Sequence, residues 1–288
     1  MAVSTPTAHP GRAAWPDVGA FEHRGRQLAY ETWGQGDRPF VLLHGLLMDG
    51  TMNRRVARAL AARGHRVVLL DLLGHGRSDK PRHAAEYRMD LYADQVVALL
   101  DHLGVDRAVV GGMSLGANVS LHTAVHHPDR IRGLIVEMPV LERAVPAAAL
   151  TFVPALLAVH YAMPVVRLVS RVAGRVRGRG VGILDAGLAP LVLPPEATAA
   201  ILHGILVGPV APTIDQRRRI AAPALVLGHR ADLIHPFTDA ENLARDLPDA
   251  RFVAGRAIFE LRLGHRRLVD EIGRFLDEVW AGQSTSAA

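Results

Sequence analysis

The stretch that most constrains the fold of this chain runs from Arg107 to Asn118 and reads RAVVGGMSLGAN. It begins with a short apolar, β-branched run, passes through two glycines and a serine, and continues into residues that favour a helix. The pattern predicts a strand, a tight turn and a helix, with Ser114 at the apex. The spacing Gly112-x-Ser114-x-Gly116 fits a turn whose serine backbone is strained and whose neighbouring side chains would clash. The serine hydroxyl is then expected to project above the sheet, beside the positive end of the following helix.

Strands alternate with helices over most of the remaining chain. Apolar runs predict strands at residues 40–43, 67–70, 131–136, 224–227 and 251–254, a hairpin is expected at 21–32, and helical patterns cover 51–62, 91–103, 237–247 and 268–280. Continuous apolar strands are typical of parallel sheets that are covered by helices on both faces. The sequence therefore predicts an α/β fold with a mostly parallel central sheet flanked by helices.

The alternation stops between residues 138 and 212, where apolar stretches are interrupted by prolines. We interpret this segment as a helical cap inserted into a core of residues 20–137 and 213–281, with flexible termini at 1–19 and 282–288. Residues 144–166 carry no formally charged side chain and are long enough to span a bilayer. They also contain three prolines and lie between two core strands. We favour a cap of broken apolar helices and keep a lid that touches lipid as an alternative.

The composition excludes several classes of function. The chain contains no cysteine, so it has no disulfide, no thiolate metal site and no thiol nucleophile. The net charge of +5 is modest for 288 residues, and no basic run is interleaved with aromatic residues, so no nucleic-acid partner is predicted. The N-terminal residues lack an apolar core of signal-peptide length, and a cytoplasmic location is expected.

Four ordered landmarks make the chain resemble the α/β-hydrolase fold family, in its serine-nucleophile, cap-containing branch, over residues 21–280. They are VLLHGL at residues 41–46, DLLGHGRSD at 71–79, the serine turn, and LVLGHRAD at 225–232. The resemblance implies Ser114 as nucleophile and the backbone N–H groups of Leu46 and Leu115 as the oxyanion hole. It implies Asp232, shortly after a buried strand, as the acid of a catalytic triad. It implies no cofactor.

The catalytic histidine is where the sequence departs from the family's pattern. The family places it just after the last strand, where this chain has Phe259 and Glu260. We predict His265 as the base, carried to Ser114 by a rearranged loop, since serine, aspartate and histidine then occur in the family's order. A helix residue that faces solvent is the alternative interpretation of that histidine. Glu260 and Glu137 are kept as alternative site carboxylates, because Glu137 ends the strand after the serine turn, where some family members carry their acid.

The remaining histidines receive other interpretations. His229, Asp232 and His235 are spaced like metal ligands, but an aspartate at a strand end is explained without a metal, so no metal site is predicted. His44 belongs to the oxyanion-loop motif and is expected to order that loop.

Three cap arginines, Arg167, Arg171 and Arg175, recur four residues apart and so share one helix face. A solvated face whose charges are screened by salt is favoured for them. An anchor for an anionic substrate group or for an acidic surface is the alternative. No oligomeric state is predicted.

These observations predict a serine hydrolase that cleaves a hydrophobic carboxylic ester, thioester or lactone through an acyl-enzyme. The expected partner is a small hydrophobic substrate. Relatives that use an aspartate nucleophile are disfavoured because the residue at the turn is serine. The alternative is a hydrolase-fold protein without a working histidine that binds a ligand or catalyses a non-hydrolytic rearrangement, with Glu260 as its acid or base.

Overall fold

The computed structural model describes residues 16–177, 182–230, 232, 234–258, 260–263 and 266–281. The strands are β1 (Asp17–His23), β2 (Arg26–Trp33), β3 (Pro39–Leu43), β4 (Arg66–Leu70), β5 (Ala108–Met113), β6 (Ile131–Glu137), β7 (Ala224–His229) and β8 (Ala250–Gly255). The helices are α1 (Arg54–Ala61), α2 (Met89–His102), α3 (Leu115–His126), α4 (Val145–Tyr161), α5 (Met163–Val176), α6 (Gly182–Val192), α7 (Pro195–Val207), α8 (Ile214–Arg217), α9 (Phe237–Asp246), α10 (Glu260–Leu263) and α11 (Arg266–Ala281). Short 3₁₀ helices are η2 (Gly50–Asn53), η3 (Ala84–Glu86) and η4 (Pro128–Arg130).

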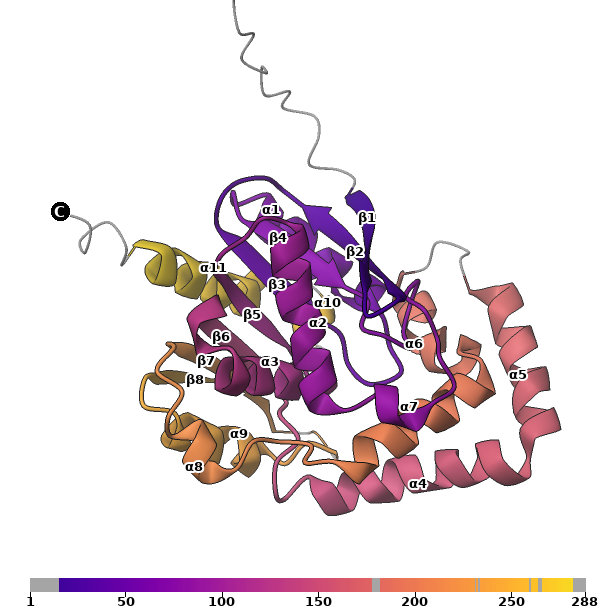
Figure 1. Ribbon diagram of the computed structural model, residues 1–288. Coiled ribbons are helices and arrows are strands. Elements are labelled where there is room, and N and C mark those ends of the chain that lie inside the picture. Colours follow the sequence, from indigo (N-terminus) through magenta and orange to yellow (C-terminus); the bar gives the residue numbers. More distant parts are fainter. Residues whose placement is uncertain are drawn as a thin grey trace, which may run out of the picture.

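The eight strands form one sheet in the order β1-β2-β4-β3-β5-β6-β7-β8. The β1–β2 and β2–β4 pairs are antiparallel, and all pairs from β4 to β8 are parallel. The mostly parallel sheet flanked by helices that the sequence predicts is therefore confirmed (Figure 1). The strand that carries the serine turn, β5, lies in the interior of the sheet.

Alternate residues of each central strand face two different helical layers. Val41 and Leu43 of β3 belong to an apolar cluster with residues of α2, α3 and α9, whereas Phe40 and Leu42 pack with α1 and α11. All four side chains are buried. Both faces of these strands are thus covered, which explains why they read as unbroken apolar runs.

The first strand begins earlier than the sequence predicts. Residues 1–19 were expected to be a flexible terminus, but Asp17 pairs with Thr32 and Gly19 with Tyr30 in the β1–β2 ladder. Backbone hydrogen bonds to β2 hold this end of the strand. Its valine, Val18, is 62% exposed, so the sequence shows no buried apolar pattern there. A Cβ on Gly19 would lie 2.4 Å from the Tyr30 ring, so glycine there leaves room for the ring in its present position. Residues 1–15 and 282–288 lie outside the described residues.

Four helices, α4 to α7, follow β6 and lie together at one side of the core (Figure 1), and the short helix α8 then leads into β7. The buried Asn118 of α3 ties both ends of this insertion to the helix after the serine. Its Nδ2 donates to Val140 O at 2.7 Å and to Val210 O at 2.9 Å, and its Oδ1 accepts from Val140 N at 2.9 Å. This insertion is therefore anchored directly to α3, the helix that follows the serine turn.

In the part of the chain that the structure describes, no single helix has both the length and the hydropathy needed to cross a membrane. The helices α4 and α5 meet that criterion only when taken together, and they are bent by 107° relative to each other.

Candidate active site

Ser114 lies at the apex of the turn between β5 and α3, with φ of 53° and ψ of −110°. This left-handed conformation is costly for a residue with a side chain and persists only where the surroundings enforce it. A Cβ on Gly112 would lie 2.8 Å from Leu43 O, and one on Gly116 would lie 2.7 Å from Leu43 Cβ. The two glycines are thus required by the approach of β3. Ser114 N donates to Glu137 O at 3.0 Å, which fixes the turn against β6.

The serine hydroxyl contacts a histidine that is itself held by an aspartate. His235 Nε2 lies 2.9 Å from Ser114 Oγ, and His235 Nδ1 lies 2.8 Å from Asp232 Oδ2. The other carboxylate oxygen of Asp232 accepts the backbone N–H groups of Ile234 at 2.8 Å and His235 at 3.0 Å. An ionised Asp232 only accepts, so Nδ1 of His235 carries the proton and Nε2 is left to accept from the serine.

The pKa of Asp232 lies below its usual value. Burial alone would raise it, but the hydrogen bonds from the His235 ring and from two backbone amides stabilise the ionised carboxylate. The side chains of Asp232 and His235 are 6% and 11% exposed, so water competes little for these bonds. The arrangement holds the imidazole with its Nε2 aimed at the serine.

The histidine at the serine is therefore His235, which the sequence analysis weighed only as a metal ligand. The predicted base, His265, lies outside the described residues. The signal for His235 was local: an aspartate that accepts the N–H groups two and three residues ahead forms a tight turn. That turn returns the side chain at position i+3 to the carboxylate, so an Asp-x-x-His sequence after β7 can hold both groups in one loop.

Glu137, an alternative site carboxylate, is buried at the end of β6 in an ion-pair network. His229 Nε2 lies 3.2 Å from Glu137 Oε1, and Arg262 pairs with the other oxygen. Burial would raise the pKa of Glu137, but Arg262 and His229 hold it below its usual value. Burial would lower the pKa of His229, and the bond to Glu137 raises it instead. Glu137 is thus paired with these two groups, and its bonds link β6, β7 and α10.

Glu260, the other alternative, begins α10 and is also paired. It accepts the N–H of Arg256 at 2.5 Å and forms an ion pair with Arg267 at 2.9 Å. Burial alone would raise the pKa of Glu260, but these bonds lower it. Its contacts bind the loop after β8 to the start of α11, and neither Ser114 nor His235 is among its partners in the described part of the chain.

The oxyanion-loop motif follows β3 and approaches the serine turn closely. A Cβ on Gly45 would lie 3.0 Å from Met113 Cε. Leu115 is the first residue of α3, where amide groups have no partner within the helix. Among the described residues, no hydrogen bond from the amide of Leu46 or Leu115 is found.

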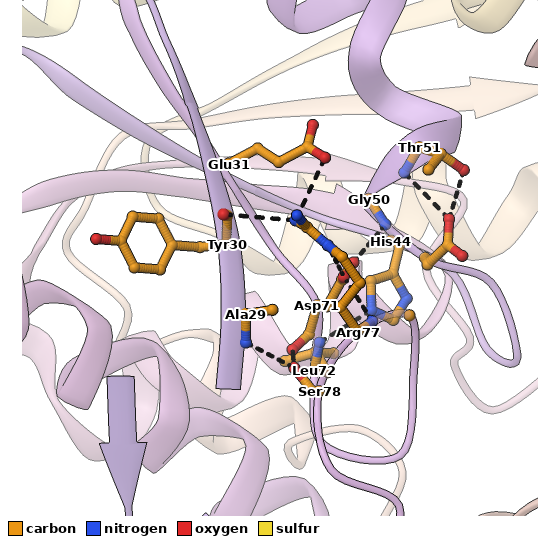
Figure 2. Close-up of polar contacts among 12 residues, drawn as sticks. Ala29, Tyr30, Glu31, His44, Gly50, Thr51, Asp71, Leu72, Arg77 and Ser78 are labelled. Carbon is orange, nitrogen blue, oxygen red and sulfur yellow. Dashed lines mark hydrogen bonds and ion pairs between the residues drawn. The ribbon is translucent and has the colours of Figure 1, made fainter. Parts of the chain in front are cut away.

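His44 orders this loop. Its Nε2 accepts the N–H of Leu72 at 3.1 Å, so its Nδ1 carries the proton and donates to Gly45 O at 2.9 Å. Figure 2 shows the His44 ring among the polar contacts of the loop after β4. The ring is committed on both nitrogens and so cannot act as a base without breaking the loop.

Asp71, at the start of the DLLGHGRSD motif, holds the chain that follows the oxyanion loop (Figure 2). Its Oδ1 accepts Gly50 N at 2.8 Å, and its Oδ2 accepts Arg77 N at 3.0 Å. Arg77 also pairs with Glu31 at 3.3 Å. Gly76 has φ of 50°, and a Cβ there would overlap the Asp71 carboxyl at 2.3 Å. The DLLGHGRSD motif thus acts as a rigid base for the oxyanion loop.

Because of His75, which lies in this motif, we expect the stability of the fold to decrease in acid. Burial and the nearby His44 lower the pKa of His75 to about 3, against 6.5 in the unfolded chain. The unfolded chain then binds more protons below pH 6.5, so stability is lost as pH falls from 6.5 toward 3. We expect His75 alone to lower the unfolding free energy by about 2 kcal/mol between pH 7 and pH 5. Denaturant unfolding at both pH values measures this difference.

The matched variants are His75→Gln and, as a control, the exposed His83→Gln. His75→Gln should flatten the pH dependence by that amount whatever its effect at pH 7. An unchanged slope in His75→Gln would refute the assignment.

Two surface cavities, of about 300 and 490 Å³, lie away from the serine. One lies between α1 and α11 and the other beside the amino ends of β4 and β5. Among the residues that the structure describes, no three His, Cys, Asp or Glu side chains are grouped closely enough to hold a metal ion. His229 and His235 have separate partners.

Comparisons with known proteins agree with this architecture. A model of the α/β hydrolase fold matches residues 38–160. An uncharacterised protein of Mycobacterium tuberculosis is 27% identical over 92% of this chain and 82% of its own length. A thermophilic esterase from Thermogutta terrifontis superposes with a TM-score of 0.68 at 26% identity, over 92% of this chain and 99% of its own. An enzyme that degrades N-acyl homoserine lactones gives 0.67 at 26% identity, over 89% and 99%.

Proposed function

The chain belongs to the α/β-hydrolase fold family, and on that premise we propose that it is a serine hydrolase of hydrophobic carboxylic esters, thioesters or lactones. The observation that carries the proposal is the continuous line of hydrogen bonds from Ser114 through His235 to Asp232. In this arrangement His235 is the base, although the position after the last strand, where the family places its histidine, holds Phe259 and Glu260. The alternative of a hydrolase fold without a working histidine loses its main support.

In the proposed reaction, His235 Nε2 takes the hydroxyl proton of Ser114 as Oγ attacks the carbonyl carbon. The developing oxyanion accepts hydrogen bonds from the amides of Leu46 and Leu115. His235 then gives its proton to the leaving oxygen or sulfur, and an acyl-enzyme remains on the serine. Water, deprotonated by His235, attacks the acyl carbon, and His235 returns that proton to Ser114 Oγ as the acid leaves. Asp232 holds the imidazole tautomer and stabilises its protonated form.

The surroundings of the serine favour an apolar acyl group. A cluster of Met52, Met113 and Met138, with Met48 and Ile258 against it, lies beside the turn. Methionine is flexible and adapts to apolar ligands of varied shape. The cap above is mostly apolar. The two similar enzymes act on esters and on lactones, as their names state, which supports these substrate classes.

A chain-length series tests this function. We expect hexanoyl p-nitrophenyl ester to give at least tenfold higher kcat/KM than the acetyl ester, because each buried methylene contributes up to ~0.8 kcal/mol. Steady-state hydrolysis of acetyl, butanoyl, hexanoyl and octanoyl esters gives the comparison. A flat or inverted series would contradict an apolar acyl site, and the absence of hydrolysis across the panel would contradict the hydrolase assignment.

A further inference from the structure

The first two cap helices expose an unusual share of the apolar surface. Fifteen large apolar side chains are exposed among the described residues, and ten of them lie on α4 and α5. We call these ten the α4–α5 surface: Val145, Leu150, Val153, Leu157, Tyr161, Val165, Leu168, Val169, Val172 and Val176. Of the 31 residues in the two helices, only Val159 and Ala173 are buried. Exposed apolar side chains gathered on two neighbouring helices in this way are typical of an interaction site.

The exposed side chains form a stripe on each helix. On α4, Leu150, Val153, Leu157 and Tyr161 recur at helical spacing, with Leu150 80% and Tyr161 79% exposed. On α5 the exposed valines and leucine between residues 165 and 176 recur in the same way. Figure 1 shows α4 and α5 at the periphery of the molecule, as two arms of an angle outside α6 and α7. Each apolar stripe therefore faces outward.

The charge on this part of the cap has one sign. Residues 143–184 contain six arginines and neither aspartate nor glutamate. Arg167 pairs with Glu196 of α7. Arg171 and Arg175 are exposed and lie one position before Val172 and Val176 of the stripe, so they flank it. An apolar stripe bordered by arginines complements a surface that is apolar inside and negatively charged outside.

We propose that the α4–α5 surface docks on an anionic lipid bilayer, with the apolar stripes in the interface and Arg171 and Arg175 at the phosphates. The 107° bend lets both helices lie along one surface and opposes a straight span. A second copy of the chain is a poorer occupant, because a two-fold contact would bring these arginines together. The proposal needs no hydrolysis, so it stands or falls separately from the proposed function.

Vesicle co-sedimentation of the Ser114→Ala protein tests the docking without turnover of lipid. We expect binding to vesicles of phosphatidylcholine with 30% phosphatidylglycerol, weak binding to pure phosphatidylcholine, and weaker binding as NaCl is raised. The double substitution Arg171→Glu and Arg175→Glu should weaken binding by about 25-fold or more, since each arginine near an anionic surface contributes roughly fivefold. The double substitution Leu150→Asn and Leu168→Asn should also weaken it.

Matched controls carry the same changes elsewhere. Arg55→Glu with Arg266→Glu alters two exposed arginines of α1 and α11, and Val18→Asn alters an exposed valine of β1. Both controls should bind like the parent. Equal binding to neutral and anionic vesicles, no binding to either, or full binding by both cap variants would overturn the proposal. The proposal would also be overturned if analytical ultracentrifugation showed a dimer in the parent that the cap variants lose.

Discussion

Replacing Ser114 with alanine is expected to lower kcat for ester hydrolysis by a factor on the order of 10⁶. The hydroxyl is the group that His235 contacts at 2.9 Å, and alanine offers no nucleophile there. Steady-state hydrolysis of the best ester in the chain-length series gives the loss. The thermal unfolding midpoint should remain close to that of the parent, since the backbone contacts of the turn do not involve the hydroxyl.

Ser120→Ala is the matched control, because Ser120 is a buried serine of α3, the helix that follows Ser114, and its hydroxyl donates to Gly116 O at 2.7 Å. Its activity should stay within a few-fold of the parent. Retention of most activity in Ser114→Ala would show that the chemistry lies elsewhere.

Replacing His235 with glutamine should cost nearly as much as losing the serine, again on the order of 10⁶ in kcat, because members of a triad act as a unit. Asp232→Asn should cost about 10⁴, since an asparagine NH₂ facing Nδ1 favours the wrong tautomer. The two substitutions sit in one loop, so their relative effects report the chemistry more than the folding. Hydrolysis rates at pH 8 give both values.

Glu260→Gln serves as the contrasting variant. It weakens the ion pair with Arg267, so a loss of stability is expected with kcat nearly unchanged. High activity in His235→Gln combined with a large loss of kcat in Glu260→Gln would contradict the triad and assign the essential acid or base to Glu260.

The features that sequence could predict are those that backbone geometry imposes on residue type. The glycines around Ser114 are required by the approach of Leu43, and such a requirement is visible in the letters alone. The strands buried on both faces read as continuous apolar runs for the same reason. Asp232 could be proposed because it lies a short turn after the buried strand β7.

The histidine could not be placed in this way. Its position depends on the path of the loop after β7, where two backbone hydrogen bonds to Asp232 turn the chain and bring His235 back. The family's order of serine, aspartate and histidine favoured His265, and that reasoning missed this local return. The start of β1 was missed for a related reason, because it is held by backbone pairing that leaves no apolar pattern.

The exposed faces of the cap were also beyond the sequence pattern. The apolar run at residues 144–166 predicts helices, but it does not tell which side chains pack inward. In the structure Leu150 and Tyr161 of α4 are exposed, whereas Val159 of the same helix is buried. This apolar helix therefore presents an apolar face to solvent.

The most direct test of the account is the rate at which a fluorophosphonate labels Ser114, followed by intact mass and peptide mapping. The parent should form one adduct, on Ser114. His235→Gln should slow labelling by about 10²–10⁴-fold, the usual contribution of a general base, while His265→Gln should label at the parent rate. Normal labelling in His235→Gln together with lost labelling in His265→Gln would contradict the Ser114–His235–Asp232 site.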